Sequence, residues 1–442
     1  MRLPWTLGYV ADGIGGSLVG DPGRLVADVV VDSRLVVGGS LFCALRGENV
    51  DGLQFADAAL AGGASGVVVP GGFEGEPRIE VEDTSTALLD IAALRRAEID
   101  VPVVAVTGST GKTSTKDLLR SVLPNAAASP RSYNNEVGVP LTVLGAPSDA
   151  DYLVVEVGSR GRGQIKWLMP AVRPDVAIIT NLGLVHLESF GTVETLADAK
   201  WELVASLTES GTAVLPAGEP RLRRTHLGKT LTFGVEPSAD IVVVDLTLDD
   251  WGRPTFDLLT ANDRATVHLL LPGAPQALNA AATTAAGLAL GLDLSTIVAG
   301  LESATGSAWR MEIHRGRFTV VNDAYNANPD SVLAALQTVA VLPGRHIAVL
   351  GKMAELGPVE VEEHRRMGSE AARLGYVAIV TVGDDPGIAS GAGAIAHAAD
   401  DAEAAMAMLD DLIEPGDVVL VKASRAVGLE GLAALLREEA GT

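Results

Sequence analysis

The chain has 442 residues, enough for about three domains of roughly 150 residues each. Its 56 acidic and 33 basic side chains leave a net charge of −23, which disfavours broad binding to nucleic acid or to anionic membrane surfaces. A hydrophobic content of 48% supports buried cores, and the single cysteine, Cys43, excludes an intramolecular disulfide and a cysteine-cluster metal site.

The N-terminal residues lack a basic segment followed by a long apolar run, so we expect no secretory signal. No run approaches the roughly 18 apolar residues that a membrane span needs. We therefore expect a cytoplasmic protein without membrane insertion.

The N-terminal part is typical of a small mixed α/β domain. Short apolar runs at Arg24–Arg34, Leu41–Leu45 and Gly66–Pro70 are separated by glycine-rich turns and an alanine-rich helical stretch. A predicted helix over Thr84–Ile99 leads into the next domain. We expect this first domain to span residues 1–97.

The pattern changes after this helix. Continuous apolar runs at Val101–Val106, Tyr152–Val157 and Val176–Thr180 alternate with helices, which predicts a parallel sheet covered on both faces. Short alternating runs between residues 230 and 271 predict an antiparallel appendage to this sheet. An alanine-rich helix, Asn279–Leu290, closes a central domain expected at residues 98–314.

The remaining residues, 315–442, are typical of a doubly wound, Rossmann-like α/β domain. Apolar runs beginning at Phe318, His346, Tyr376 and Gly416 end in polar or glycine residues and alternate with helical stretches. The predicted fold class is thus α/β with three domains. In such sheets, ligands lie beyond the carboxyl ends of the strands.

The segment Thr107–Thr113 (TGSTGKT) follows an apolar strand and opens a helix. Its glycines allow backbone N–H groups to turn toward phosphate oxygens, and the helix N-terminus adds partial positive charge. Lys112 is expected to bridge the β- and γ-phosphates, and the Thr113 hydroxyl to bind Mg²⁺. The full motif would have glycine where Val106 stands, so a chance glycine turn is the alternative. The strand before and the helix after favour phosphate binding.

Two further residues occupy unusual places near strand ends. Glu156 interrupts an apolar strand, where an unpaired carboxylate is costly to bury. Mg²⁺ would offset that cost, and the alternative is solvent or an arginine such as Arg160. His186 follows a predicted parallel strand, which favours a role in the same site, although a loop histidine is most often structural or solvated.

Lys200 shares one helix face with Leu196, Leu203 and Leu207. It either extends its ammonium to solvent, the more common outcome, or is buried with a depressed pKa. A lysine with a depressed pKa would be nucleophilic and could take up CO₂ as a carbamate, an anion able to sit beside a metal.

The segment Asn322–Ser331 (NDAYNANPDS) runs from a strand end into a helix. Asn328 as N-cap, followed by proline, explains part of it structurally. Capping does not explain Asp323, Tyr325 or Asn326, which indicate a ligand loop.

Two basic positions remain. Arg310, before the first strand of the third domain, could contact nucleotide from a hinge near Ser307–Arg317. Lys422–Arg425 ends the last predicted strand, where a solvated basic edge is an equally good interpretation.

In order, the segments GSTGKTS, SYNNEVGVPLT, EVGSRGRGQI, NLGLVHLESFG, DAKWEL, WRMEIHRG, NDAYNANPDS, VLGKMAELG and VKASR resemble the Mur ligase family over nearly the whole chain. The N-terminal VVDSR and GGSLFCALRGENVDGLQFADAAL resemble the family's UDP-binding domain. The NDAYNANPDS loop is most similar to the branch that joins D-alanyl-D-alanine to UDP-N-acetylmuramoyl-tripeptide. The branch that adds the third residue usually carries an Asn-Pro-Arg element, which is absent here.

This resemblance implies an ATP-dependent ligase of cytoplasmic peptidoglycan precursor synthesis, and thus of cell-wall biogenesis and cell division. The tripeptide carboxylate would attack the γ-phosphoryl group, and the amine of D-alanyl-D-alanine would then attack the acyl phosphate. The implied cofactors are ATP and Mg²⁺ at two positions, with a carbamylated Lys200 supporting the second. The implied form is a monomer.

The resemblance also implies residue roles by position. Those implied for catalysis are Lys112, Lys200 and His186. Those implied for ATP binding are Gly108, Ser109, Thr110, Gly111, Lys112, Thr113, Ser114, Asn279, Arg310, Asp323 and Asn326. Those implied for substrate are Ser33, Arg34, Asn134 and Asn135, and those for metal are Thr113, Glu156, His186 and, if carbamylated, Lys200.

Three positions depart from the family pattern. Pro275 and Gln276 stand where His-Asn is frequent, which puts an adenine contact in question. Lys352 replaces a common acidic residue, and Leu53 replaces a frequent histidine. None is a phosphate or metal position, so an active ligase is expected. The alternatives are another Mur-type or folylpolyglutamate-synthase-like enzyme, and a non-catalytic nucleotide-binding protein.

Overall fold

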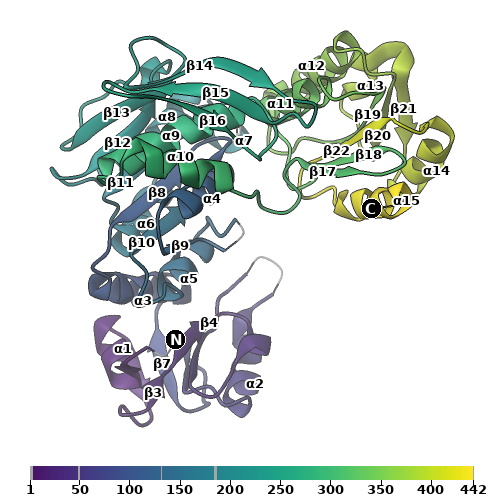
Figure 1. Ribbon diagram of the computed structural model, residues 1–442. Helices are drawn as coiled ribbons and strands as arrows, with labels where there is room; N and C mark the ends of the chain where they lie inside the picture. Colours follow the sequence, from purple (N-terminus) through teal and green to yellow (C-terminus); the bar gives the residue numbers. More distant parts are fainter. Residues whose placement is uncertain (1–2, 48–49, 131, 184–186, 442) are drawn as a thin grey trace.

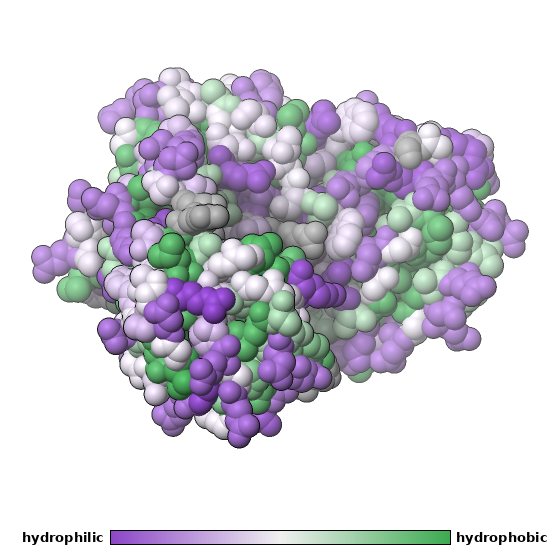
Figure 2. All heavy atoms as spheres, turned by 90° about the horizontal axis from the view of Figure 1, so that it is seen from below, coloured by the Kyte–Doolittle hydropathy of each residue, from purple (hydrophilic) through white to green (hydrophobic). Residues whose placement is uncertain are grey.

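The computed structural model describes residues 3–47, 50–130, 132–183 and 187–441, which fold into three α/β units (Figure 1). The central unit contacts both of the others, and the N-terminal and C-terminal units extend from it in different directions. Seen from below, hydrophilic and apolar side chains are interspersed over the visible face of the molecule (Figure 2). In the described ranges, no helix has the length and apolar character needed to cross a bilayer.

The N-terminal unit is built on a five-stranded sheet of order β2-β7-β6-β5-β4, in which only the β2–β7 pair is antiparallel. Strands β1 and β3 form a separate antiparallel pair. The elements are β1 (Trp5–Thr6), α1 (Leu7–Gly13), β2 (Ser17–Val19), β3 (Leu25–Val26), β4 (Asp28–Val30), β5 (Ser40–Cys43), α2 (Ala56–Ala61), β6 (Gly66–Pro70), β7 (Arg78–Val81) and α3 (Thr84–Glu98). The expected mixed α/β character is therefore observed.

The central unit contains a nine-stranded sheet of order β16-β15-β14-β13-β12-β11-β8-β10-β9. Its strands are β8 (Val103–Thr107), β9 (Ala126–Ala128), β10 (Tyr152–Glu156), β11 (Val176–Ile179), β12 (Thr212–Pro216), β13 (Lys229–Gly234), β14 (Ile241–Leu248), β15 (Pro254–Leu259) and β16 (Arg264–His268). Its helices are α4 (Lys112–Val122), α5 (Gly138–Leu144), α6 (Gln164–Val172), α7 (Leu187–Phe190), α8 (Val193–Ala205), α9 (Pro275–Ala289) and α10 (Leu294–Ser303).

Strand β8 explains why the apolar runs in this unit are continuous. All five of its residues are buried. Val104 and Val106 pack in a core with residues of α4 and α9, whereas Val103 and Ala105 pack in a second core with residues of α5, α6 and α8. Both faces of the sheet are thus covered, as the sequence pattern predicts.

The predicted antiparallel appendage is only partly correct. β13 pairs with β12, and β14 with β13, in the parallel direction, and the second of these pairings joins only two residue pairs. Only the β14–β15 and β15–β16 pairings are antiparallel. Alternating polarity reports that one face is exposed but says nothing about strand direction, which is why the prediction failed here.

The C-terminal unit has a six-stranded sheet of order β17-β18-β22-β19-β20-β21, parallel except for the β17–β18 pair. Its elements are β17 (Glu312–Arg315), β18 (Thr319–Asn322), α11 (Pro329–Val339), β19 (His346–Gly351), α12 (Glu360–Arg373), β20 (Ala378–Val382), α13 (Ile388–Ala392), β21 (Ala396–Ala399), α14 (Ala402–Leu412), β22 (Val418–Lys422) and α15 (Glu430–Ala440). This is the expected doubly wound arrangement.

The expected domain boundaries fall at structured positions. The boundary after residue 97 lies at the end of α3, which packs against α5 and α6 of the central unit, and the boundary after residue 314 lies within β17. Both boundaries remain predictions.

Candidate active site

The glycine loop between β8 and α4 has a backbone that only glycine accommodates well. Gly108 and Gly111 have φ of 149° and 79°, in the region that side chains disfavour. A Cβ on Gly108 would lie 1.9 Å from the Thr180 hydroxyl oxygen, and one on Gly111 would lie 2.5 Å from Asn279 Oδ1. The predicted loop therefore has a shape that a larger residue would disrupt.

Asn181, which follows β11, braces this loop. Its Oδ1 accepts hydrogen bonds from the backbone N–H groups of Ser109 (3.1 Å) and Thr110 (2.9 Å). The Ser109 hydroxyl also accepts a hydrogen bond from the N–H of Gly183 at 2.9 Å. Sequence reasoning missed Asn181, whose position directly after a parallel strand was the available signal. The Ser109 N–H also donates to the backbone carbonyl oxygen of Asn181 at 3.2 Å. Both N–H groups therefore bond to Asn181, which must move before they can face a phosphate.

Lys112 opens α4 and folds back over the loop. Its Nζ donates hydrogen bonds to the carbonyl oxygens of Gly108 (2.6 Å) and Ser109 (3.1 Å). Desolvation lowers the pKa of Lys112, the nearby Arg310 lowers it further, and Glu156 opposes this shift. The ammonium thus lies at the place where phosphate oxygens would compete with loop carbonyls for it.

Glu156 ends β10 and is 1% exposed. Its Oε2 accepts a hydrogen bond from the Thr113 hydroxyl at 2.9 Å, and its Oε1 accepts one from Asn134 Nδ2 at 2.7 Å. Neither solvent nor Arg160 is its partner, because the carboxylate is buried and Arg160 lies 3.6 Å from Glu355. Arg310 completes the cluster by donating to the Thr113 hydroxyl at 2.9 Å.

The chemistry of this cluster fits Mg²⁺. A hydroxyl and a carboxylate supply hard oxygen ligands, and Mg²⁺ usually takes only one or two carboxylates together with phosphate oxygens and water. Within the described ranges, no cluster of three or more His, Cys, Asp or Glu side chains could hold a metal ion without phosphate or water ligands. Thr113 and Glu156 are therefore the residues able to hold a nucleotide-bound Mg²⁺.

Lys200, on α8, does not reach solvent. Its side chain is 1% exposed, and its Nζ donates to the Ser159 hydroxyl at 3.3 Å. Burial lowers its pKa well below the ordinary value of 10.5, and the charge of Lys112 lowers it further. The rarer of the two sequence interpretations is thus the observed one. His186 lies outside the described residues.

A cavity of about 750 Å³ joins these residues to the C-terminal unit. The central unit contributes Lys112, Asn134, Asn135 and Lys200, whereas the C-terminal unit contributes Tyr325, Asn326, Asn328, Ser424 and Arg425. Part of the predicted site is therefore assembled in one space between two units. The ion pair of Arg160 with Glu355 crosses the same boundary.

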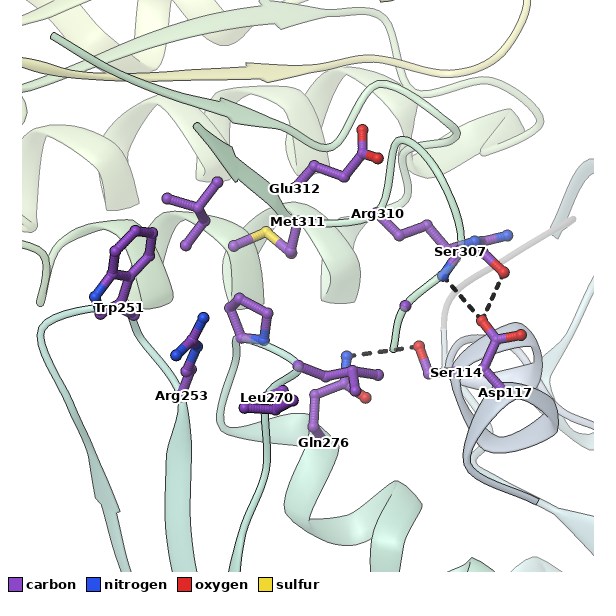
Figure 3. Close-up of a pocket in the computed structure, with 14 residues that line it drawn as sticks. Ser114, Asp117, Trp251, Arg253, Leu270, Gln276, Ser307, Arg310, Met311 and Glu312 are labelled. Carbon is purple, nitrogen blue, oxygen red and sulfur yellow. Dashed lines mark hydrogen bonds between the residues drawn. The ribbon is translucent and has the colours of Figure 1, made fainter. Parts of the chain in front are cut away.

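A second, smaller pocket of about 190 Å³ is lined in part by Arg310 (Figure 3). Ser114, Trp251 and Gln276 line it, and Gln276 Nε2 donates to the Ser114 hydroxyl at 3.5 Å. Gln276 Oε1 accepts a hydrogen bond from Asn279 Nδ2 at 2.9 Å, which links this pocket to the glycine loop. The predicted nucleotide residues Ser114 and Asn279 thus lie together around α4.

Asp323, an expected nucleotide residue, has its partners in the C-terminal unit and in the segment that leads into it. It does not line either pocket, and it pairs with the buried Lys422 while its Oδ1 accepts a hydrogen bond from the Met311 N–H at 3.1 Å. The Arg310 guanidinium lies 4.1 Å from the centroid of the Tyr325 ring. Asp323 and Tyr325 therefore hold the interdomain segment on either side of Arg310.

Ser33 and Arg34 stand apart from the other predicted residues. They begin a short 3-10 helix after β4, and Arg34 is exposed and pairs with Asp32 at 2.7 Å. Neither residue lines the two pockets described above. The structure does not bring them to the glycine loop.

Comparison with known proteins assigns the family. Three family models match the chain. The model named "Mur ligase middle domain" matches residues 106–287, and the model named "Mur ligase, glutamate ligase domain" matches residues 309–425. The model named "Mur ligase family, catalytic domain" matches residues 26–96. The chain belongs to the Mur ligase family. The resemblance inferred from sequence motifs is thereby confirmed.

Close relatives of this Mur ligase carry one name. The UDP-N-acetylmuramoyl-tripeptide–D-alanyl-D-alanine ligase of Mycobacterium tuberculosis is 34% identical and covers 97% of this chain and 96% of its own. The enzyme of the same name from Escherichia coli is 33% identical and covers 98% of each chain.

Solved structures agree with the three-domain fold. MurF from Acinetobacter baumannii superposes with a TM-score of 0.93, at 30% identity over 99% of each chain. MurF from Thermotoga maritima in complex with ADP has a TM-score of 0.85 at 30% identity, covering 94% of this chain and 98% of that one. The folylpolyglutamate synthase of Mycobacterium tuberculosis, at 17% identity and a TM-score of 0.65, shares the fold alone.

The unusual Lys352 of this Mur ligase has a local explanation. Its Nζ pairs with Asp384 at 3.0 Å and with Glu360 at 3.1 Å, outside both pockets. The departure from an acidic residue is compensated by two carboxylates and leaves the described site unchanged.

Proposed function

We propose that this Mur ligase uses ATP to join D-alanyl-D-alanine to UDP-N-acetylmuramoyl-tripeptide, through an acyl phosphate. The observation that carries the proposal is the cavity in which Lys112 and Lys200 of the central unit face Asn326 and Ser424 of the C-terminal unit. It lies beside the glycine loop and has room for two reacting groups. The names of the full-length relatives supply the two substrates.

The first step is transfer of the γ-phosphoryl group to the terminal carboxylate of the tripeptide. A carboxylate oxygen forms a bond to phosphorus while the bond to the β-phosphate oxygen breaks and ADP leaves. Lys112 neutralises the phosphates, and the start of α4 stabilises negative charge. Asn181 must release the N–H groups of Ser109 and Thr110 for the loop to close on phosphate.

A Mg²⁺ ion held by Thr113 and Glu156 would neutralise the phosphate oxygens during this transfer. Arg310 lies within hydrogen-bond distance of Thr113, so it is placed to turn from that hydroxyl toward the phosphates. Gln276 and Ser114, in the smaller pocket, are the proposed contacts for the adenine base. The amide of Gln276 can donate and accept one hydrogen bond each, as an asparagine at this position would.

The second step is attack of the D-alanyl-D-alanine amine on the acyl carbon. The amine nitrogen bonds to the acyl carbon and gives up a proton, which the departing phosphate can accept. The tetrahedral intermediate collapses as phosphate leaves with the electrons of the carbon–oxygen bond. An acyl phosphate also reacts with water, so the cavity between the units must close during this step. We propose that the C-terminal unit closes with a hinge near Ser307–Arg317.

Lys200 is the proposed support of a second metal position, as a carbamate. Burial lowers the pKa of the Lys200 amine and so favours its neutral form, which can attack CO₂. The new group would be anionic, which would replace the repulsion between Lys200 and Lys112 by attraction. His186 is proposed to share this position.

The remaining assignments concern the rest of the substrate and the setting. Ser33 and Arg34 are proposed to contact the uridine diphosphate, and Asn134 and Asn135 the tripeptide end. We propose a cytoplasmic monomer. The fold does not by itself identify D-alanyl-D-alanine as the acceptor, because enzymes that add other residues share this fold.

The test is phosphate release from ATP with UDP-N-acetylmuramoyl-tripeptide and D-alanyl-D-alanine, with each component omitted in turn. Release is expected only when all three are present. A panel separates the alternatives, with diaminopimelate or lysine as acceptor for the shorter UDP-linked precursor and with glutamate as acceptor for a folate. Activity with one of these and none with D-alanyl-D-alanine would overturn the proposed acceptor, and no release with any would favour a non-catalytic nucleotide-binding protein.

A further inference from the structure

The carboxylate of Asp117 ties the phosphate-binding helix α4 to the segment that joins the central and C-terminal units. Its Oδ2 accepts hydrogen bonds from the Ser307 N–H at 3.0 Å and from the Ser307 hydroxyl at 2.6 Å (Figure 3). Its Oδ1 lies 3.0 Å from Lys116 Nζ, and Asp117 is 2% exposed. A buried carboxylate with these donors is a firm anchor, because losing one leaves buried charge unsatisfied.

The same segment touches α4 at a second point. Arg310, three residues after Ser307, donates to the Thr113 hydroxyl at 2.9 Å. Thr113 precedes Asp117 by four residues, so both side chains lie on one face of the helix, one turn apart. The segment therefore runs along α4, with one contact at Asp117 and the other at Thr113.

These two contacts differ in what can disturb them. Thr113 is a proposed Mg²⁺ ligand, and a cation bound there would repel the Arg310 guanidinium. Asp117 lies one turn farther along the helix, and its contacts with Ser307 and Lys116 involve neither the proposed Mg²⁺ ligands nor the glycine loop. Nucleotide binding is therefore expected to break the contact at Thr113 and leave the contact at Asp117 intact.

The residues on either side of Arg310 have an uncommon backbone. Trp309 and Met311 have φ of 61° and 52°, in the left-handed region that residues with a Cβ rarely adopt. Carbonyl and N–H contacts to Tyr325 and Asp323 hold them there. Strain of this kind is concentrated between the anchor at Ser307 and the first strand of the C-terminal unit, where a hinge must turn.

We infer that Asp117 is a positioning residue that fixes Ser307 as the pivot of domain closure. With the pivot held, the downstream part of the segment can carry Arg310 from Thr113 to the phosphates in one defined direction. The inference rests on the nucleotide part of the proposed function. Asp117 and Ser307 also line the smaller pocket proposed for the adenine base, so nucleotide affinity is measured beside kcat to separate the two roles.

The test compares four variants. Asp117→Ala removes the anchor, Asp117→Asn keeps its shape and one acceptor oxygen, and Ser307→Ala removes one of the two hydrogen bonds while leaving the Lys116–Asp117 pair intact. Ser121→Ala is the matched control, because its hydroxyl donates to the backbone carbonyl of Asp117 and not to the carboxylate. The measurements are Mg-ADP affinity by calorimetry, kcat and KM for ATP, and small-angle scattering with and without a non-hydrolysable ATP analogue.

We expect Asp117→Ala to lower kcat about 10- to 100-fold, the range that misplacement of a reacting group produces. Mg-ADP affinity should fall much less than kcat, since Lys112, Thr113 and Glu156 are unchanged and Asp117 only lines the edge of the proposed adenine pocket. The compaction that the analogue produces in the wild type should be reduced. Asp117→Asn and Ser307→Ala should be intermediate, and Ser121→Ala should match the wild type.

Two results would overturn this inference without affecting the proposed function. The first is a kcat and a compaction equal to those of the wild type in both Ser307→Ala and Asp117→Asn. The second is a parallel loss of kcat, Mg-ADP affinity and thermal stability in both variants, because a purely structural role produces that pattern. If Asp117→Ala does not fold, these two variants still decide. Failure of the wild-type chain to bind Mg-ADP would instead overturn the proposed function, and the inference with it.

Discussion

The hydroxyl of Thr113 and the carboxylate of Glu156 lie 2.9 Å apart although 43 residues separate them in sequence. The parallel pairing of β10 with β8 sets Glu156 opposite Val106, and the glycine loop then returns the chain to Thr113 at the start of α4. The sheet topology thus brings together the two oxygen atoms that can hold Mg²⁺.

Glu156→Gln should impair use of Mg²⁺ while preserving the fold. The amide keeps an oxygen that can accept the Thr113 hydrogen bond but removes the negative charge that attracts the cation. We expect Mg²⁺-dependent strengthening of ADP binding to be lost and kcat to fall by about 100-fold or more, the scale of a lost charge-stabilising group. Calorimetry with and without Mg²⁺ measures the first effect. Unchanged dependence on Mg²⁺ would show that Glu156 is not a ligand.

Lys112→Ala should abolish turnover. The variant loses the cation that now bonds the Gly108 and Ser109 carbonyls and that we expect to bridge the phosphates. A loss of about 1000-fold in kcat is expected for removal of such an electrostatic contact. Thermal unfolding should change little, because the side chain lies in a cavity. Near-normal turnover would refute the phosphate assignment.

Lys200 should carry the additional mass of one CO₂ in the native chain. Burial keeps the amine from solvent and lowers its pKa, which favours the neutral, nucleophilic form that reacts with CO₂. We expect native mass spectrometry to detect the adduct, removal of CO₂ to slow turnover, and small carboxylates to rescue Lys200→Ala in part. The exposed Lys166 serves as an internal control that stays unmodified. A wild-type rate indifferent to CO₂, together with an unmodified Lys200, would exclude the carbamate.

Cys43 should resist thiol reagents in the folded chain. It is fully buried on β5, and desolvation raises the pKa of its thiol to about 12 from an ordinary value of 9.0. Because the folded pKa is the higher one, the stability gained from the neutral thiol is complete below pH 9.0 and is lost as the pH rises toward about 12. Labelling in native buffer and in denaturant tests the first point. A wild-type versus Cys43→Ala stability difference that grows with pH would contradict the second.

Sequence reasoning succeeded where a residue is informative in its own neighbourhood. The glycine loop, the carboxylate of Glu156 within an apolar strand, and Lys200 on an apolar helix face are all local signals. Even so, periodicity alone left open whether Lys200 reaches solvent. The structure settles this, because Lys200 is 1% exposed and its Nζ donates to the Ser159 hydroxyl at 3.3 Å.

The residues that escaped prediction depend on distant partners. Asn181 meets Ser109 across 72 residues, and Asp117 meets Ser307, at the start of the predicted hinge, across 190. No local spacing marks such pairs, because each side chain alone is an ordinary polar residue. Strand direction failed for the same reason at β13 and β14, whose pairing is decided by the whole sheet.

The central claim is that the glycine loop holds ATP so that a substrate carboxylate can be phosphorylated. The most direct measurement uses tripeptide substrate whose terminal carboxylate is labelled with heavy oxygen, with ATP, Mg²⁺ and D-alanyl-D-alanine, and follows the label by mass spectrometry. The account predicts that one labelled oxygen appears in the released phosphate for each peptide bond formed. Product formation with no label in the phosphate would contradict it.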